Sequence, residues 1–303
     1  MASLASGLAP ARVSHNKRRF AAAYPNWFYL PAAIIYGILF LVPTFASFFF
    51  SLTRWTLFDA TFIGLDNFVQ FFSEPFLIKG LVNTLIYGAV TSGLKVVLGM
   101  MLGLLLTSDI FGRGYLRSVV FFPVLVSTVG VGITFTVMMH PTHGIINETL
   151  AQFGIKGPGW LTDPRFVLLS LALVDVWKGV GLATVIYIAG IVSIPRDYFE
   201  AGKIDGATGW QSFRSIMLPL LAPATTTVLL LSLIGGLRSF DLIWAMTKGG
   251  PGFTSDVLAS VIYKQYQAGF YGLSTAGNVV LFVLVALLIV PLSLYFNRRE
   301  REQ

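Results

Sequence analysis

The stretch EAGKIDGATGWQSFRSIMLPLLAP, residues 200–223, interrupts an otherwise apolar sequence. Runs without Asp, Glu, Lys or Arg occupy residues 20–53, 118–147, 215–237 and 265–297. A helix that spans a bilayer needs about 20 apolar residues, and each of these runs is long enough. Only 12% of the residues are charged, about half the usual share in a soluble domain. The sequence therefore predicts an all-α membrane protein.

We expect six transmembrane helices, at residues 27–50, 82–107, 117–139, 166–194, 215–239 and 275–297. With both termini in the cytoplasm, 12 of the 21 Lys and Arg residues fall in the inside segments and 6 in the outside segments. This excess is what the positive-inside rule requires. The predicted organisation is a cytoplasmic tail at 1–26, a first span with its external segment at 27–80, a core of five spans at 81–297, and a cytoplasmic tail at 298–303.

Several kinds of chemistry are excluded by composition. The chain has no cysteine, so it forms no disulfide and no cysteine-based metal site. Two of its three histidines, His140 and His143, lie in a segment that reads as turns, and we expect no metal there. No Lys is followed by Ser or Thr, so the chain lacks a P-loop for ATP. We expect no cofactor in this chain and no nucleic-acid partner.

The polar stretch has its own helix signals. Pro195 ends the fourth span, and Asp197 with Glu200 has the spacing of a capping box. Gly206 can adopt the left-handed conformation that ends a helix, and Thr208 with Gln211 forms a second box. These signals predict two short helices in a cytoplasmic insert. Such an insert either lies on the lipid headgroups or packs against a separate protein.

Three charged residues fall inside predicted spans: Lys95, Asp175 and Lys178. Asp175 and Lys178 are three residues apart, so they can pair on one helix face. Such charges usually face a bundle interior or a cavity. Two readings remain open here, a structural pair at a helix interface and a polar cavity that binds a ligand. Gly99 and Gly103, four residues apart, allow close helix contact.

The insert resembles the EAA loop of permease subunits of ATP-binding-cassette (ABC) importers. Its spacing is kept throughout residues 197–219, and the matching residues are Glu200, Ala201, Gly202, Asp205, Gly206, Ile216, Leu218 and Pro219. Gly202 departs from the family's second Ala, which implies a slightly softer coupling helix because Gly costs about 1 kcal/mol against Ala. The resemblance implies the type I ABC importer permease fold and a coupling role for this loop, in which Glu200 anchors the insert by capping and by contacts to an ATPase.

Two further segments are similar to the carbohydrate branch of this family. They are the turn Thr247-Lys248-Gly249-Gly250-Pro251 and the element Val176-Trp177-Lys178-Gly179. The resemblance implies that the chain forms half of the translocation pore for a sugar, most simply a di- or oligosaccharide. It also implies a substrate path through Asp175, Lys178, Gly179, Leu182, Ser232, Gly236 and Ser239. Arg238 and Asp241 either join this path or pair with each other.

The same resemblance implies the partners. They are a paralogous permease subunit that completes a heterodimer, two ATPase subunits that bind ATP and Mg²⁺, and an external sugar-binding protein that docks on residues 140–165 and 240–274. The expected location is the cell membrane of a bacterium or archaeon. Lys95, Lys178 and Arg238 also suit a phosphorylated polyol such as glycerol 3-phosphate. Two other classes remain as alternatives, a secondary transporter that works alone and a membrane-embedded enzyme.

Overall fold

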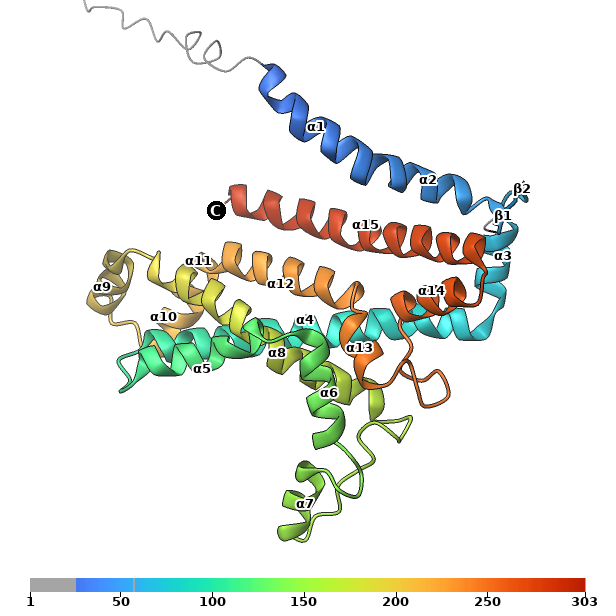
Figure 1. Ribbon diagram of the computed structural model, residues 1–303. Coiled ribbons are helices and arrows are strands. Elements are labelled where there is room, and N and C mark those ends of the chain that lie inside the picture. The colour runs from blue at the N-terminus through green and yellow to red at the C-terminus, as the bar shows by residue number, and fades with distance from the viewer. Residues whose placement is uncertain (1–25, 57, 303) are drawn as a thin grey trace, which may run out of the picture. The chain divides into compact units, whose positions relative to one another are not determined.

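The computed structural model describes residues 26–56 and 58–302, and its regular structure is almost entirely helical (Figure 1). The chain forms two compact units, Met1–Ala46 and Ser47–Gln303. One continuous apolar helix forms the described part of the first unit and extends a few residues past the boundary into the second unit. It consists of η1 (Asn26–Tyr29), α1 (Leu30–Tyr36), the π-helical turn η2 (Gly37–Leu41) and α2 (Val42–Phe50). Apart from Asn26, the predicted tail at 1–26 lies outside the described residues.

Four helices are long and apolar enough to cross a membrane. They are Trp27–Phe50, α4 (Pro75–Thr107), α8 (Val167–Val192) and Tyr271–Arg299 within α15 (Tyr271–Glu302). They correspond to the first, second, fourth and sixth predicted spans. The predicted tail at 298–303 continues α15 as a helix up to Glu302.

The third and fifth predicted spans are bent pairs rather than single helices, so the prediction is wrong in this detail. In the third, α5 (Arg113–Leu125) and α6 (Thr128–Met138) meet at 99°, because Val126 and Ser127 are extended. In the fifth, Gly209–Leu220 and α12 (Ala222–Leu237) meet at 63°. Pro223 has no amide hydrogen for the carbonyl of Pro219, so the helical ladder breaks between them. The described chain has up to six spans if each bent pair crosses as one.

A small β-ribbon departs from the all-α prediction. Strands β1 (Thr53–Trp55) and β2 (Ala60–Phe62) pair antiparallel. Asn67, on α3 (Asp66–Ser73), holds the ribbon from the side. Its amide nitrogen donates to the carbonyls of Ser51 and Thr53, both at 2.8 Å. The ribbon depends on this tertiary contact, which the local sequence pattern does not reveal.

Helices α4 and α8 form the main helix–helix seam of the second unit, and glycines set their separation. A Cβ atom added at Gly99 would lie 2.7 Å from Cβ of Ala183, and one at Gly103 would lie 2.8 Å from Cβ of Tyr187. Real Cβ contacts are longer, so only Gly permits this approach. The predicted close contact at Gly99 and Gly103 is confirmed.

The remaining helices pack around this seam. α12 packs against α4, α8 and α15, and α14 (Leu258–Gln267) joins α4 to α15 (Figure 1). α13 (Asp241–Met246) packs against α6, while α7 (Ile145–Gln152) lies in the turn-rich segment predicted at 140–165. After the C-terminal end of α8, the polar insert follows as a separate pair of short helices.

Candidate functional site

Polar side chains form a stripe along one buried face of α4. Asn83, Tyr87, Thr91 and Lys95 follow one another at intervals of four residues, which places them on the same face. None of the four is more than 8% exposed. The Tyr87 hydroxyl has no hydrogen-bond partner among the described residues. Polar groups inside a span are costly, so this α4 polar stripe marks a site with a structural or transport role.

The stripe ends in an ion pair between two helices. Nζ of Lys95 lies 2.6 Å from Oδ2 of Asp175 on α8, and the two side chains are 10% and 21% exposed. Of the two readings left open above, the pairing of Asp175 with Lys178 is not the one found, because Asp175 pairs with Lys95. Two charges three residues apart gain only a few tenths of a kcal/mol from pairing. The buried Lys95 ammonium needs a partner far more, because an unpaired charge there costs several kcal/mol.

Gly179 makes room for this ion pair. A Cβ atom at position 179 would lie 2.7 Å from Cε and 2.9 Å from Nζ of Lys95. The Lys95 side chain thus passes over the bare backbone of α8 to reach Asp175. Gly179 therefore has a packing role, whether or not it also lies on the predicted substrate path.

The other residues of the predicted substrate path differ in burial and in their contacts. Gly236 is buried, with an added Cβ atom 2.9 Å from Cα of Gly88 on α4, so it serves helix packing. Lys178 is half-buried and forms no ion pair within the described part of the chain, nor do Arg238 and Asp241 pair with each other. Three more positions are half-buried or exposed: Leu182, Ser232 and Ser239.

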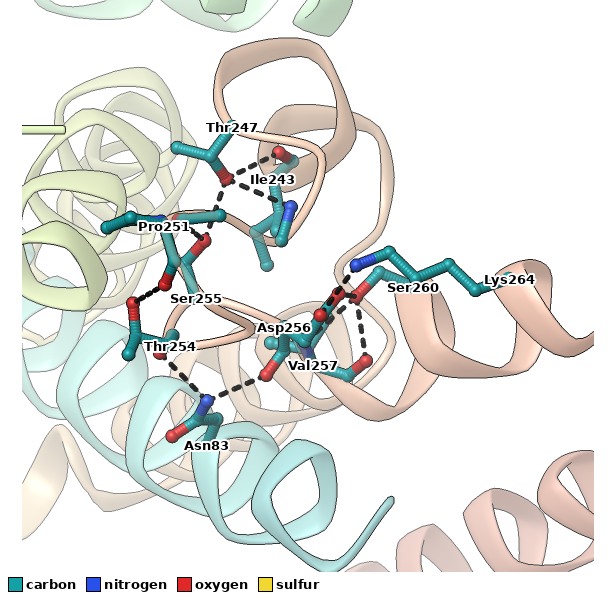
Figure 2. A network of polar contacts seen from close by, with 12 residues as sticks. Asn83, Ile243, Thr247, Pro251, Thr254, Ser255, Asp256, Val257, Ser260 and Lys264 are labelled. Carbon is teal, nitrogen blue, oxygen red and sulfur yellow. Dashed lines mark hydrogen bonds and ion pairs between the residues drawn. The ribbon is translucent and has the colours of Figure 1, made fainter. Parts of the chain in front are cut away.

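At the other end of the stripe, a network around Asp256 locks the loop that precedes α14 (Figure 2). The Asp256 carboxylate is 1% exposed and lies 2.6 Å from Nζ of Lys264, while the hydroxyl of Ser260 donates to it at 2.7 Å. The amide of Asn83 donates to the carbonyls of Thr254 and Asp256, at 3.0 and 2.8 Å. One stripe residue is thereby bonded to a loop far away in the sequence.

Sequence reasoning missed this network, although a signal existed. Asp256, Ser260 and Lys264 follow one another at four-residue intervals, the spacing of one helix face. The quoted turn residue Thr247 also belongs to the network, since its hydroxyl lies 2.8 Å from that of Ser255 (Figure 2). Asn83, from α4, carried no such local signal.

The turn-rich segment 140–165 is held by its own polar contacts. Nδ1 of His140 accepts from the backbone amide of His143, which confirms a turn, and no metal cluster forms among the described residues. The Trp160 indole donates to Oδ1 of Asn147 at 2.7 Å. Hydrogen bonds from the Arg165 guanidinium and backbone amide lower the pKa of the half-buried Asp163 carboxyl.

The polar insert contains α9 (Arg196–Ile204), α10 (Gly209–Ser212), the π-helical turn η3 (Phe213–Met217) and α11 (Leu218–Leu220). The first predicted capping box is wrong. Pro195 is the N-cap of α9, and no side chain caps this helix. Since the chain turns at this proline, Asp197 lies inside the first turn and Glu200 forms no return bond. The predicted capping role of Glu200 is wrong for the same reason.

The end of α9 and the second capping box follow the prediction. Gly206 has a φ of 80°, and the amide of Ala207 donates to the carbonyl of Gly202 at 2.8 Å. The hydroxyl of Thr208 accepts from the amide of Gln211, whose side chain accepts in return from the amide of Thr208. The end of α9 and the start of α10 are thus satisfied within the insert.

The surface of the insert combines buried glycine with exposed apolar side chains. Gly202 is buried, and a Cβ atom there would lie 2.8 Å from Cδ1 of Ile216, so Gly lets α9 approach η3. Glu200, Ala201, Asp205 and Gly206 are exposed. Three large apolar side chains also point outward: Tyr198 at 53%, Ile204 at 87% and Trp210 at 66% exposed.

Comparisons with known proteins agree with this arrangement. Residues 95–302 match the family model of the binding-protein-dependent transport system inner membrane component. The trehalose/maltose transport system permease protein MalF of Thermococcus litoralis is 33% identical over 258 residues, which cover 84% of this chain and 88% of the relative.

Two solved structures share the fold, each at 24% identity. A bacterial ABC transporter that imports the acidic polysaccharide alginate has a TM-score of 0.77, over 89% of this chain and 94% of that one. A bacterial alginate ABC transporter in complex with an alginate pentasaccharide-bound periplasmic protein has a TM-score of 0.74, over 91% and 93%. Taken with the membrane helices, these matches show that the chain is an integral membrane protein of the binding-protein-dependent ABC importers, and that it belongs to their carbohydrate-type permease subunits.

Proposed function

We propose that this permease subunit forms half of a translocation pore for a di- or oligosaccharide and is driven by a separate ATPase through its polar insert. The exposed apolar surface on α9 and α10 carries this proposal. Tyr198, Ile204 and Trp210 lie more than half exposed on α9 and α10, and the turn between these helices is already satisfied by hydrogen bonds within the insert. A short helix of this kind is marginal alone and gains stability when a partner covers it.

The insert is well placed to transmit movement. α9 follows α8, which carries Asp175, and α11 leads into α12 across the 63° bend. A displacement of the insert therefore acts on two of the three helices that meet at the α4 polar stripe. The chain has no P-loop of its own, so ATP and Mg²⁺ bind to the partner in this proposal.

The remaining partners in this proposal are those that the family resemblance implies. A paralogous permease subunit completes the pore as a heterodimer. Two ATPase subunits bind on the cytoplasmic side, where both termini of this chain also lie. An extracytoplasmic sugar-binding protein docks on residues 140–165 and 240–274. The assembly lies in the cell membrane of a bacterium or archaeon.

The coupling proposal is tested by reversing one exposed charge. Glu200→Lys is expected to abolish co-purification with the ATPase and uptake, while the chain still reaches the membrane. Glu148→Lys makes the same change on the exposed surface of α7 and should leave ATPase binding intact. Normal uptake in the Glu200 variant would overturn the coupling role of the insert.

The proposed substrate class rests on a neutralised polar centre. Lys95 and Asp175 cancel each other's charge, yet the Asp175 side chain remains 21% exposed and can accept from sugar hydroxyls. The MalF relative is named for trehalose and maltose. Uptake measured over a panel of neutral sugars should find a saturable di- or oligosaccharide, and Asp175→Asn should raise its KM.

Unpaired positive charge favours a second candidate, a phosphorylated polyol such as glycerol 3-phosphate. Once Lys95 is neutralised by Asp175, Lys178 remains without an ion pair within the described chain, as does Arg238. One fold relative is titled for an acidic polysaccharide. Saturable uptake of glycerol 3-phosphate alone, lost in Lys178→Met, would replace the neutral-sugar proposal.

A further inference from the structure

The loop between α13 and α14 has a tip, residues 248–253, that holds two side chains on strained backbone. Lys248 has a φ of 50° and Phe253 a φ of 63°, both in the left-handed region that favours Gly. No other non-glycine residue of the described chain has a positive φ. Such a conformation is unfavourable for a residue with a side chain, so it persists only where surrounding contacts enforce it.

Hydrogen bonds around the tip enforce this conformation (Figure 2). The hydroxyl of Ser255 donates to the carbonyl of Gly250, and that of Thr254 donates to the carbonyl of Pro251, both at 2.5 Å. The two bonds from Asn83 then fix the residues that follow the tip to α4. The tip is therefore a rigid extension of a buried network.

This network presents the Phe253 ring to the outside. The side chain is 52% exposed. Nζ of Lys264 lies 4.9 Å from the ring centroid, and the same Nζ pairs with the buried Asp256 carboxylate. The ring of Phe76, in the first turn of α4, lies 6.0 Å away. Exposed apolar area on strained backbone is unfavourable for the chain alone, so the arrangement indicates a partner that covers the ring.

The tip lies beyond the bilayer, on the side where α4 begins. Phe76 comes six residues before residue 82, where the second predicted span starts, and α4 is already helical there. Six helical residues advance about 9 Å along the axis. The headgroup layer on each side of a bilayer is about 5–8 Å thick. The partner therefore approaches from the aqueous phase, which favours a protein over lipid.

A cavity beside the tip connects it to the other external segment. Its volume is about 370 Å³, and its walls include Gly250 and Pro251 of the tip as well as His140 and Leu161 of the segment 140–165. No carboxylate lines this cavity among the described residues, and the tip adds one exposed cation, Lys248. The surface therefore fits a protein that offers a carboxylate beside an apolar pocket.

We propose that residues 248–253 are the docking tip for the importer's sugar-binding protein, with Phe253 as the anchor in an apolar pocket and Lys248 opposite a carboxylate. The proposal rests on the proposed function, in which that protein docks on residues 140–165 and 240–274. It adds that two preorganised side chains provide most of the affinity. A tip that is already rigid loses little conformational freedom on binding.

The test titrates the importer, assembled in nanodiscs, with its sugar-binding protein loaded with the transported sugar, and measures ATPase stimulation. Phe253→Ala should raise the concentration for half-maximal stimulation about tenfold, as expected for an aromatic anchor. Phe111→Ala removes a fully exposed ring from the loop between α4 and α5, on the predicted cytoplasmic side, and should change it less than twofold. Equal concentrations for Phe253→Ala and the unmodified importer would remove Phe253 from the docking surface.

This experiment separates the failure of the docking tip from the failure of the proposed function. If the sugar-binding protein does not stimulate even the unmodified importer, the proposed function is wrong. If it stimulates the unmodified importer and the Phe253 variant at the same concentration, the proposed function stands and only the docking tip is wrong.

The charge of the tip is tested separately. Lys248→Glu should raise the same concentration at least fivefold. Lys79→Glu makes the same change at an exposed position of α4, on the same side of the membrane, and should change it less than twofold. Equal losses in the two variants would indicate a general effect of charge and exclude a specific contact at Lys248.

The strain of the tip predicts a difference between two truncations. Gly fits a φ of 63° without strain, so Phe253→Gly should melt about 2 °C higher than Phe253→Ala. Both variants should weaken docking equally, because both lack the ring. A lower melting temperature for Phe253→Gly would show that the tip is not strained and would contradict its preorganisation.

Hydrogen exchange distinguishes a protein partner from lipid. Addition of the sugar-binding protein should slow amide exchange in residues 248–253 at least fivefold. Slowing that already occurs on transfer from detergent to nanodiscs, with no further effect of the sugar-binding protein, would place the tip in the headgroups and overturn the docking proposal.

Discussion

The α4 polar stripe buries polar side chains, whereas the polar insert exposes apolar side chains. Along the stripe, polar groups are buried, and its two ends are bonded to distant segments, through Lys95–Asp175 and through Asn83 to the loop before α14. In the insert, the end of α9 and the start of α10 are satisfied locally, and large apolar side chains such as Ile204 remain exposed.

This difference follows from where each region can find its partners. Within a bilayer no water replaces a missing hydrogen bond, so a buried charge must be paired inside the protein. An insert in water needs no such pairing and can keep an apolar surface for another protein. Changes in the stripe should therefore cost stability, whereas changes on the insert surface should cost coupling.

The largest effect on stability is expected from breaking the ion pair of the stripe. Asp175→Leu leaves the Lys95 ammonium buried without a partner and should lower the free energy of unfolding by about 3 kcal/mol. The double variant Lys95→Met/Asp175→Leu should recover to within about 1 kcal/mol of the original. Unfolding in mixed micelles measures both.

Lys178→Met is the matched control for this prediction. Lys178 lies on the same helix as Asp175, and its ammonium forms no ion pair in the described structure. Its effect should stay below about 1 kcal/mol. Equal effects of Asp175→Leu and Lys178→Met would show that pairing with Lys95 is not what stabilises the seam.

The next effect concerns the end of the stripe at Asn83. Asn83→Leu removes the donor to two carbonyls, those of Thr254 and Asp256, and should cost about 2 kcal/mol. Amide hydrogen exchange in residues 247–257 should rise at least tenfold. Asn278→Leu, at an exposed position of α15, should change neither quantity. Unchanged hydrogen exchange in the Asn83 variant would show that the stripe does not stabilise this loop.

A pair of glycines on α4 tests the close approach of the seam. Gly103→Ala places a methyl group against Cβ of Tyr187 and should destabilise the protein by about 1–2 kcal/mol. Gly93 has open space around it, so Gly93→Ala should be neutral or stabilise by up to about 1 kcal/mol. Thermal unfolding should show a lower midpoint for Gly103→Ala and an unchanged or higher midpoint for Gly93→Ala, and an equal decrease in both variants would contradict the tight seam.

The smallest effect on stability is expected from the insert surface. Ile204 is 87% exposed, so Ile204→Ser should change the free energy of unfolding by less than about 0.5 kcal/mol. The same variant should lose binding to the ATPase, measured by co-purification. A large loss of stability would show that this side chain packs within the chain, and intact ATPase binding would remove it from the coupling surface.

Much of the fold could be predicted from local signals. Hydropathy predicted six spans, of which four are single long helices, while Gly206 predicted the end of α9 and Thr208 with Gln211 predicted the start of α10. These succeed because hydropathy and capping depend on residues close together in the sequence. The missed bend at Ser127 and the β-ribbon depend on backbone geometry and on contacts from other segments.

The candidate site could be predicted only in part. Lys95 and Asp175 were recognised as intramembrane charges, but the only partner considered for Asp175 was its helical neighbour Lys178, whereas the structure pairs it with Lys95. Helix spacing shows which residues share one face, and it does not show which helix that face meets. Asn83 illustrates the limit, since both carbonyls that it binds lie more than 170 residues away.

The sequence by itself determined the membrane class, the place of the insert along the chain, the family resemblance and the absence of a P-loop, because composition and short motifs carry this information along the chain. Only the tertiary structure decided the partner of each buried charge, the bends of the third and fifth spans and the packing role of Gly179. The physical reason is that a buried polar group must find its partner wherever the fold brings one within reach.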